Sequence, residues 1–262
     1  MIRLGVCTSP ANAAEVAQIG FDYIELGLSS IAAMSEEEFN TLAAQMDECP
    51  IKAEAYNGML PASVPVTGPD VNASQQHEYL ELAFARAHRL GGKVVVFGSS
   101  GARNVPEGYP IDMAWRQVVN FLRLAERHAA NYDITIAIEP LRKKESNIIN
   151  YVSEAVLLSS IHQLPHIRAL GDTYHMAMGS EPLSALTLAG DMLAHVHTAN
   201  AIGRKYPAPG DGENYEGIFE ALIEGGYDAR VSIEGGCTDF SAEARAAFEV
   251  LTQARDAAYA KK

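Results

Sequence analysis

The sequence predicts an α/β fold, a single (β/α)8 TIM barrel over residues 1–262, and three observations favour it. The chain has 262 residues, close to the roughly 250 typical of one closed barrel. Short strand-like runs alternate with amphipathic helical windows along the whole chain, a rhythm typical of βα units around a parallel sheet. Eight such units can be counted, each of about 30 residues, which is the number and size that a barrel requires.

The eight predicted strands are short and several are almost entirely apolar, as expected for strands covered on both faces. They span residues 3–7, 23–26, 52–56, 93–97, 134–138, 167–170, 194–197 and 230–233. Apolar residues at three- and four-residue spacing predict helices over 35–46, 74–90, 115–130, 216–224 and 242–257. Ser35 and Glu38 form a capping-box pattern at the start of the first window. Irregular segments over 57–71, 98–111 and 199–214 follow strands, so we expect them over the C-terminal mouth of the barrel.

Composition limits the class of protein. Hydrophobic residues make up 48% and charged residues 20%, the profile of an ordinary globular chain. No apolar run approaches the roughly 20 residues that span a bilayer, and the first residues do not resemble a secretion signal, so we expect a cytoplasmic protein without a membrane partner. Cys7, Cys49 and Cys237 are too scattered for a disulfide framework or a thiolate metal site. The formal charge of −13 argues against nucleic acid as a partner, because it repels polyphosphate.

Four polar side chains stand at the C-terminal ends of the last four predicted strands. Glu139 closes the fifth strand, Asp172 follows the sixth, His197 ends the seventh and Glu234 ends the eighth. Side chains at these positions of a barrel point into one common mouth. Any one of them alone could be a helix cap, but four converging acceptors without a cation would repel one another. Their oxygen and nitrogen donors suit one divalent metal ion, with Mn²⁺ preferred and Mg²⁺ or Co²⁺ as alternatives.

The order of these motifs resembles the xylose-isomerase-like superfamily of TIM barrels. The motifs are Glu-Pro on the fifth strand, Asp-x-x-His on the sixth, His-x-His on the seventh and Ile-Glu-Gly on the eighth. Within that group the chain most resembles the sugar isomerases and epimerases, which include ketose 3-epimerases and hydroxypyruvate isomerase. The resemblance implies that the four residues bind one divalent metal and that Glu139 and Glu234 also carry protons on and off carbon. It further implies a small sugar as substrate and a homodimer or homotetramer.

The resemblance also suggests which side chains contact the substrate. Glu145 in Glu-Pro-Leu-x-x-x-Glu takes the place of a substrate-binding glutamate, and His175 matches a histidine that binds substrate hydroxyl groups. Arg204 is the candidate for an arginine expected shortly after the strand-seven histidine, although the spacing is one residue longer than the family pattern. Asn57 follows the third strand and is expected to reach substrate hydroxyls. Glu25 ends the second strand, where a substrate contact and a structural hydrogen bond are equally compatible with the pattern.

Two further sets of residues are interpreted from position alone. Six basic residues lie in loops predicted on the catalytic face, and they would attract a phosphate or carboxylate on the substrate unless they are simply solvated; they are Arg103, Arg142, Lys143, Lys144, Arg204 and Lys205. His195 shares the seventh strand with His197 and is expected to face the helix layer, as a packing residue or as support for the site.

The expected chemistry is proton removal from carbon next to a carbonyl, which creates an enediolate that a metal stabilises. A carboxylate on each face then acts as base or acid, so epimerisation or a 1,2-shift is available. A metal-dependent dehydratase or lyase acting on a keto-sugar or keto-inositol would use the same residues and remains an alternative. A non-catalytic sugar-binding barrel is less compatible with a complete ligand set. An endonuclease IV-like nuclease needs three metals, and the histidines for them are missing from Glu-Leu-Gly, Ala-Tyr-Asn and Phe-Gly-Ser after strands two to four.

Overall fold

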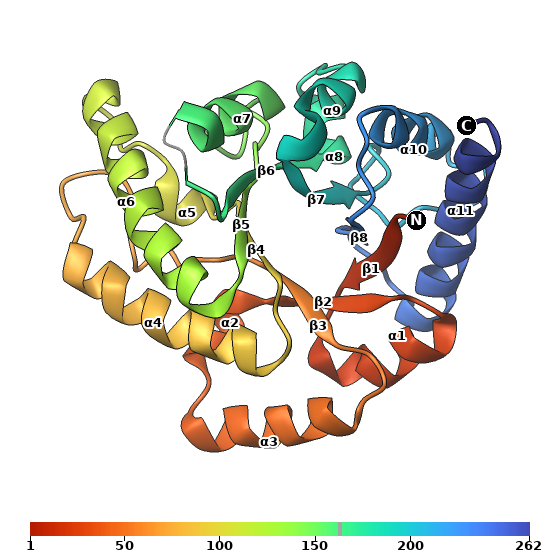
Figure 1. The fold of residues 1–262 in the computed structure, drawn as a ribbon, viewed down its shortest axis with the longest axis horizontal. Helices are drawn as coiled ribbons and strands as arrows, with labels where there is room; N and C mark the ends of the chain where they lie inside the picture. Colours follow the sequence, from red (N-terminus) through yellow and green to blue (C-terminus); the bar gives the residue numbers. More distant parts are fainter. Residues whose placement is uncertain (162–163) are drawn as a thin grey trace.

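Eight parallel strands close into a barrel in the computed structural model, which describes residues 1–161 and 164–262 (Figure 1). Each strand pairs with the next one along the chain, and β8 pairs with β1 to complete the ring. The strands are β1 (Arg3–Cys7), β2 (Tyr23–Gly27), β3 (Ala53–Asn57), β4 (Val94–Phe97), β5 (Thr135–Ile138), β6 (Ile167–Asp172), β7 (Leu193–Thr198) and β8 (Arg230–Ile233). The predicted (β/α)8 barrel is therefore confirmed, and every predicted strand overlaps an observed one.

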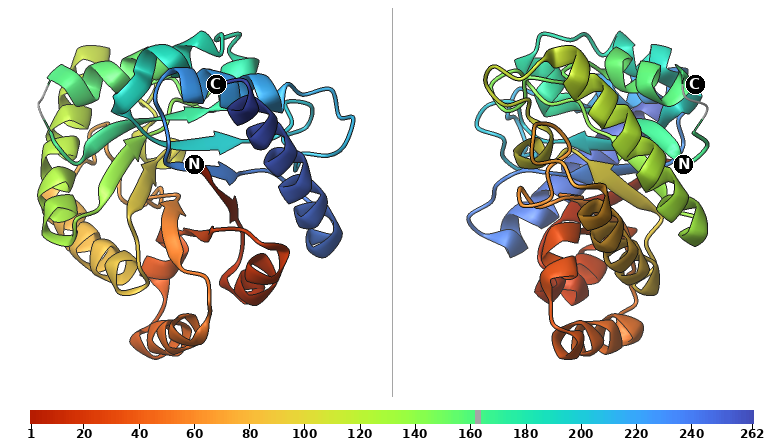
Figure 2. Two further views of the ribbon diagram at one scale, coloured as in Figure 1. Left: turned by 45° about the vertical axis from the view of Figure 1, so that its right-hand side comes forward. Right: turned by 90° about the vertical axis from the view of Figure 1, so that its left-hand side faces the viewer.

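Helices cover the outside of the barrel, as two further views show (Figure 2). They are α1 (Ala13–Ile19), α2 (Leu28–Ala33), α3 (Glu36–Glu48), α4 (Ala73–Arg89), α5 (Ser100–Arg103), α6 (Ile111–Tyr132), α7 (Val152–Ile161), α8 (Thr173–Met178), α9 (Ser184–Ala189), α10 (Tyr215–Glu224) and α11 (Phe240–Ala260), with 3-10 turns at Pro10–Asn12 and Gly190–Met192. The predicted capping box is present at the start of α3, where Ser35 and Glu38 exchange side chain to backbone hydrogen bonds. The ring centroids of Phe21 and Phe248 lie 4.9 Å apart, so the first and last parts of the chain pack together. No helix in the described parts of the chain is both long enough and apolar enough to cross a membrane.

Two groups of side chains fill the molecule. A large apolar core lies between strands and helices, and a smaller cluster that includes Tyr23, Val96 and Leu170 fills the inside of the barrel. Gly5 on β1 makes room for the tyrosine, because a Cβ at Gly5 would lie 2.3 Å from the Tyr23 ring.

The orientation expected for His195 is wrong. His195 has no exposed surface and hydrogen-bonds to Glu25 inside the barrel, so it does not face the helix layer. The physical reason is the period of a strand, in which residues two apart point to the same side. His195 and His197 therefore share the inner face of β7, as Tyr23 and Glu25 share that of β2.

An ion cluster joins three strands at the N-terminal end of the barrel, opposite the mouth. Arg3 on β1 donates two hydrogen bonds of 2.7 Å to the carboxylate of Glu54 on β3, and Nε of Arg230 on β8 donates one of 2.8 Å. Burial alone would raise the pKa of Glu54, but the hydrogen bonds from the two arginines outweigh it and hold that pKa below its ordinary value of 4.5. The ionised form of Glu54 therefore stabilises the closed ring.

We predict that Glu54→Gln lowers the free energy of unfolding at pH 7 by about 1–2 kcal/mol, a partly exposed charged hydrogen-bond network being worth less than a buried one. Because the folded-state pKa is depressed, the contribution of Glu54 is present above its ordinary pKa and is lost as pH falls through the folded value. Urea unfolding at a series of pH values should show the difference from wild type shrinking below about pH 4.5. If the variant were less stable than wild type by the same free energy of unfolding at pH 7 and at acidic pH, the prediction would be wrong. The control is Glu249→Gln, on the exposed face of α11.

Candidate active site

The four side chains predicted at the strand ends come together at one end of the barrel. Glu139 directly follows β5, Asp172 ends β6, His197 lies near the end of β7 and Glu234 directly follows β8. One potential ligand atom from each lies within 4.8 Å of those from the others. Nδ1 of His197 is 3.2 Å from a carboxylate oxygen of Glu139 and 3.2 Å from one of Glu234. The first three side chains are buried and that of Glu234 is 22% exposed, so the set opens toward the mouth on the Glu234 side.

The two oxygens of Asp172 have different surroundings. Oδ1 accepts hydrogen bonds from the backbone N–H groups of Tyr174 (2.8 Å) and His175 (3.1 Å), which caps the N-terminus of α8. Oδ2 is buried and has no hydrogen-bond partner among the described residues. A buried carboxylate oxygen without a partner is costly, and a cation among the three neighbouring donors would satisfy it. Together with the mixture of oxygen and nitrogen donors, this oxygen shows that the four residues fit one divalent metal ion.

Negative charge is concentrated at this cluster. Burial, together with the carboxylates of Glu139 and Glu234, raises the pKa of Asp172 to about 8. Burial would also raise the pKa of Glu234, but the charge and hydrogen bond of His197 outweigh it and hold that pKa at about 2. Burial alone would lower the pKa of His197. The negative charges of Glu25 and Glu234 outweigh burial and hold that pKa well above its ordinary value. More acidic than basic groups therefore converge here, as at a site built for a cation.

Arg204 reaches the same cluster from the loop after β7. Its guanidinium lies 2.6 Å from Oε2 of Glu234, 3.6 Å from Oδ2 of Asp172 and 3.7 Å from Oε2 of Glu145. It also stacks over the ring of Tyr174, with 4.9 Å between its central carbon and the ring centroid. The backbone of Arg204 is in the left-handed region, with φ +51°, and its side chain reaches Glu234 despite the longer spacing noted in the sequence.

His175 presents a hydrogen-bond donor to the mouth. Its Nδ1 accepts a hydrogen bond from the backbone N–H of Arg142 (3.2 Å), so a neutral ring carries its proton on Nε2. Nε2 is buried, has no hydrogen-bond partner among the described residues, and lies 4.0 Å from Oε2 of Glu145. Burial and the charge of Arg204 lower the pKa of His175 to about 4, so the ring is neutral at pH 7. Asn57 ends β3, and its side chain lies beside the thiol of Cys7.

The chain matches the family model of the xylose isomerase-like TIM barrel over residues 13–254. It belongs to this family. The resemblance inferred from the motifs is confirmed, and the related proteins include sugar epimerases.

Two of these relatives and one solved structure with the same fold show how far the similarity extends. The 3-dehydro-D-guloside 4-epimerase of Escherichia coli (strain K12) is 31% identical over 173 residues, which cover 63% of this chain and 64% of the relative. The D-psicose 3-epimerase of Ruminiclostridium cellulolyticum is 25% identical over 236 residues, covering 84% of this chain and 75% of that protein. The crystal structure of the apo form of 3-keto-D-glucoside 4-epimerase from E. coli superimposes with a TM-score of 0.83 at 21% identity, over 97% of this chain and 100% of that one.

One predicted substrate contact is wrong for this xylose isomerase-like barrel. Arg103 was expected at the mouth, but the short helix α5 turns it inward and it has no exposed surface. Its guanidinium donates to the backbone carbonyls of Phe97 and Glu139, both at 2.6 Å, and of Ile149 at 3.5 Å. Arg103 therefore joins the ends of β4 and β5 and positions the backbone of Glu139. Arg142 is another of the basic residues predicted on the catalytic face. It forms an ion pair with Glu145, with 2.6 Å between Nε and Oε1.

We predict that Arg103→Met lowers the free energy of unfolding by about 2 kcal/mol, because the buried carbonyl of Glu139 loses its donor, whereas those of Phe97 and Ile149 each keep a backbone N–H. Urea unfolding measures this loss, and Lys143→Met, which removes an exposed charge from the neighbouring loop, is the control. A variant that keeps wild-type stability would return Arg103 to the group of candidate substrate contacts.

A glycine that the sequence did not mark as functional lies against Glu139. Gly98 directly follows β4, and a Cβ built there would lie 1.7 Å from Oε2 of Glu139. The signal in the sequence is the Phe-Gly-Ser-Ser-Gly run, whose first glycine directly follows the strand. The structure shows that Gly98 leaves space for the Glu139 carboxylate.

We predict that Gly98→Ala displaces the Glu139 carboxylate and weakens binding of Mn²⁺ by about tenfold or more, while the protein stays folded. Isothermal titration with Mn²⁺ measures the affinity. Gly27→Ala is the matched control, because the nearest atom to its Cβ would be at an ordinary 3.5 Å. Equal Mn²⁺ affinity in Gly98→Ala and Gly27→Ala would contradict the prediction. It would show that the space beside Gly98 does not determine where the Glu139 carboxylate lies.

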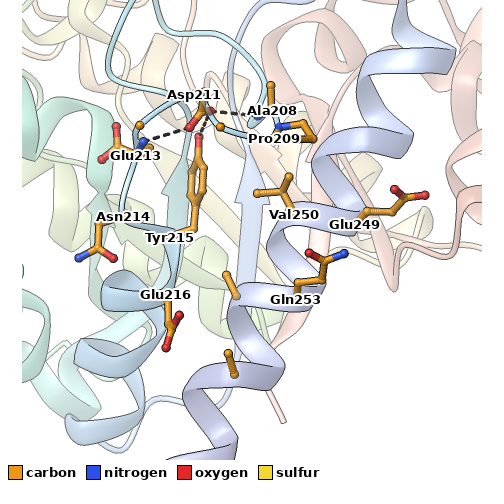
Figure 3. A pocket seen from close by; sticks show the side chains of 14 residues that line it. Ala208, Pro209, Asp211, Glu213, Asn214, Tyr215, Glu216, Glu249, Val250 and Gln253 are labelled. Carbon is orange, nitrogen blue, oxygen red and sulfur yellow. Dashed lines mark hydrogen bonds between the residues drawn. The ribbon is translucent and has the colours of Figure 1, made fainter.

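A separate surface pocket of about 760 Å³ lies outside the mouth, between the loop around 208–216 and α11 (Figure 3). Its central carboxylate, Asp211, accepts hydrogen bonds from the backbone of Ala208 (2.9 Å) and Glu213 (3.0 Å) and from the hydroxyl of Tyr215 (2.8 Å), as drawn in Figure 3. The carboxylate is thus used to shape the loop that carries Arg204. The residues that line this pocket do not include the four converging residues of the mouth.

Proposed function

We propose that the chain is a divalent-metal-dependent sugar epimerase or isomerase, acting on a ketose or a related small keto-sugar. The observation that carries the proposal is the arrangement of Glu139 and Glu234, which approach Nδ1 of His197 from β5 and β8 at 3.2 Å each. Two carboxylates from different sides of one mouth provide a base and an acid for a substrate held between them. The names of the related epimerases support the same class of reaction.

Glu139, Asp172, His197 and Glu234 are the residues that would hold the metal, with Mn²⁺ as the first choice and Mg²⁺ or Co²⁺ as alternatives. A divalent ion bound there supplies positive charge next to the oxygens that become negative when a proton leaves the neighbouring carbon. The unpartnered Oδ2 of Asp172 supports this assignment.

The remaining residues orient the sugar. His175 donates from Nε2 to a substrate hydroxyl, Glu145 accepts from another, and Asn57 lies within the same mouth at the end of β3. Arg204 holds Glu234 and Glu145 in place and offers a donor to a substrate oxygen. Glu139 or Glu234 removes the proton from one face of the carbon. Return of a proton to the opposite face by the other glutamate would invert the centre. Return to the adjacent carbon, with the hydroxyl proton passing to the former carbonyl oxygen, would move the carbonyl.

A dehydratase or lyase reaction on a keto-sugar or keto-inositol is the second candidate. The observation in its favour is the neutral His175, whose Nε2–H would donate a hydrogen bond to a departing β-hydroxyl group, while the glutamate that took the proton from carbon would return it to that group as water leaves. The two reactions share the first proton transfer and differ in their product.

We predict that the protein loaded with Mn²⁺ incorporates deuterium from D₂O next to the carbonyl of at least one member of a panel of ketoses, 3-keto-glycosides and keto-inositols. NMR follows the exchange and identifies the product, which separates an epimer from a dehydrated compound. Glu139→Gln and Glu234→Gln should each lower the exchange rate by about 100-fold or more, because each removes an acid/base group. EDTA should abolish exchange.

The control for these variants is Glu216→Gln, which removes a carboxylate on α10 that pairs with Lys261 away from the mouth. Full exchange in both Glu139→Gln and Glu234→Gln would contradict the assigned roles. A wild-type protein that binds the sugars but neither binds Mn²⁺ nor exchanges a proton would be a sugar-binding barrel.

A further inference from the structure

The inside of this barrel contains a polar section directly below the metal-binding residues. Barrel interiors are normally filled by layers of branched apolar side chains. Here five polar side chains, all without exposed surface, share the interior on β2, β7 and β8; they are Tyr23, Glu25, His195, His197 and Ser232. A buried carboxylate is unfavourable unless donors surround it. The contacts of Glu25 therefore indicate the role of these five buried polar side chains.

Glu25 joins two histidines. Its Oε1 lies 2.9 Å from Nε2 of His197, and its Oε2 lies 2.8 Å from Nε2 of His195. His195 also lies 3.3 Å from the hydroxyl of Ser232, which is 2.8 Å from the hydroxyl of Tyr23. Both oxygens of Glu25 are thus engaged by imidazole groups, and the carboxylate, with no exposed surface, is out of reach of a substrate.

The two nitrogens of His197 face different groups. Nδ1 faces Glu139 and Glu234, which are proposed metal ligands, whereas Nε2 faces Glu25. An ionised carboxylate only accepts hydrogen bonds, so Nε2 of His197 must carry a proton in the contact with Glu25. The hydrogen bond at one imidazole nitrogen determines that the other nitrogen is free to bind a metal.

We propose that Glu25 is a positioning residue for the metal site: it holds His197 with Nδ1 as the ligand atom, and His195 fixes the second oxygen of Glu25. The inference rests on the proposed metal-dependent function and deepens it. It also decides between two possible ion positions, because Cys7, Glu25 and His197 offer a second group of ligand atoms within 4.8 Å. An ion there would bind Nε2 of His197 and displace the proton that Glu25 accepts.

The test measures Mn²⁺ affinity by the electron paramagnetic resonance signal of the free ion, in wild type and three variants. Glu25→Gln removes the charge at nearly constant shape and should weaken Mn²⁺ binding about 10- to 100-fold, the usual effect of losing a partner of a ligating histidine. Cys7→Ala should bind as tightly as wild type, because Cys7 is not a ligand in this arrangement. Tyr23→Phe removes the far end of the polar section, leaves the Glu25 contacts in place, and should also bind like wild type.

Wild-type affinity in Glu25→Gln would overturn the inference, and so would a Cys7→Ala variant as weak as Glu25→Gln, which would make Glu25 a direct ligand. A wild-type protein that binds no Mn²⁺ would overturn both the inference and the proposed metal dependence. Tight Mn²⁺ binding with the expected variant effects, but without proton exchange on any sugar, would remove the proposed reaction and leave the inference standing.

A second measurement identifies the nitrogen of His197 that binds the metal directly in the wild-type protein. Wild-type protein labelled with ¹⁵N-histidine is loaded with Zn²⁺, a diamagnetic probe, and His197 is assigned by comparison with His197→Asn. Long-range ¹H–¹⁵N spectra should show Nε2 of His197 protonated and Nδ1 bound to metal. The reverse pattern would overturn the inference.

Discussion

The pairing of β8 with β1 is the constraint on which the site depends. When the ring closes, all eight parallel strands end on one face, so side chains that follow β5, β6, β7 and β8 meet although they are far apart in the sequence. Local interactions then orient each one. Arg103 holds the backbone of Glu139, the N-terminus of α8 holds Oδ1 of Asp172, and Glu25 holds His197.

The convergence of acids has an electrostatic cost, and His197 and Arg204 offset part of it without occupying the proposed metal position. His197 lies between Glu139 and Glu234, and Arg204 bridges Glu234 toward Asp172 from the other side. Neither satisfies Oδ2 of Asp172, which remains buried among like charges. The negative charge that remains is therefore concentrated around Oδ2 of Asp172. This local excess of negative charge is what the proposed metal ion would neutralise, and it is distinct from the overall formal charge of −13.

The strands and the four strand-end residues were predictable because apolar periodicity and motif order are properties of the sequence alone. The position of Arg103 was not predictable in the same way, because a charged residue in a loop is normally exposed. No local pattern in the sequence indicates that α5 turns its side chain toward three carbonyl groups. His195 was placed on the wrong face, although the two-residue period of a strand already puts it beside His197. The role of Glu25 was not decidable, because both of its partners come from β7, which only barrel closure brings near β2.

Polar groups run through the barrel from base to mouth, and their energetic roles change along the way. At the base, Arg3 and Arg230 bind Glu54 and both lie over the Tyr23 ring, at 5.7 Å and 5.9 Å. These pairs tie strands together, because the hydrogen bonds from the two arginines outweigh the desolvation of Glu54. Further in, the fully buried carboxylate and imidazoles would be replaced by apolar side chains if stability alone mattered, since buried ion pairs rarely exceed a well-packed apolar core in stability. Their presence beneath His197 is consistent with the proposed role of Glu25, which is to orient the nitrogen of His197 that would bind the metal.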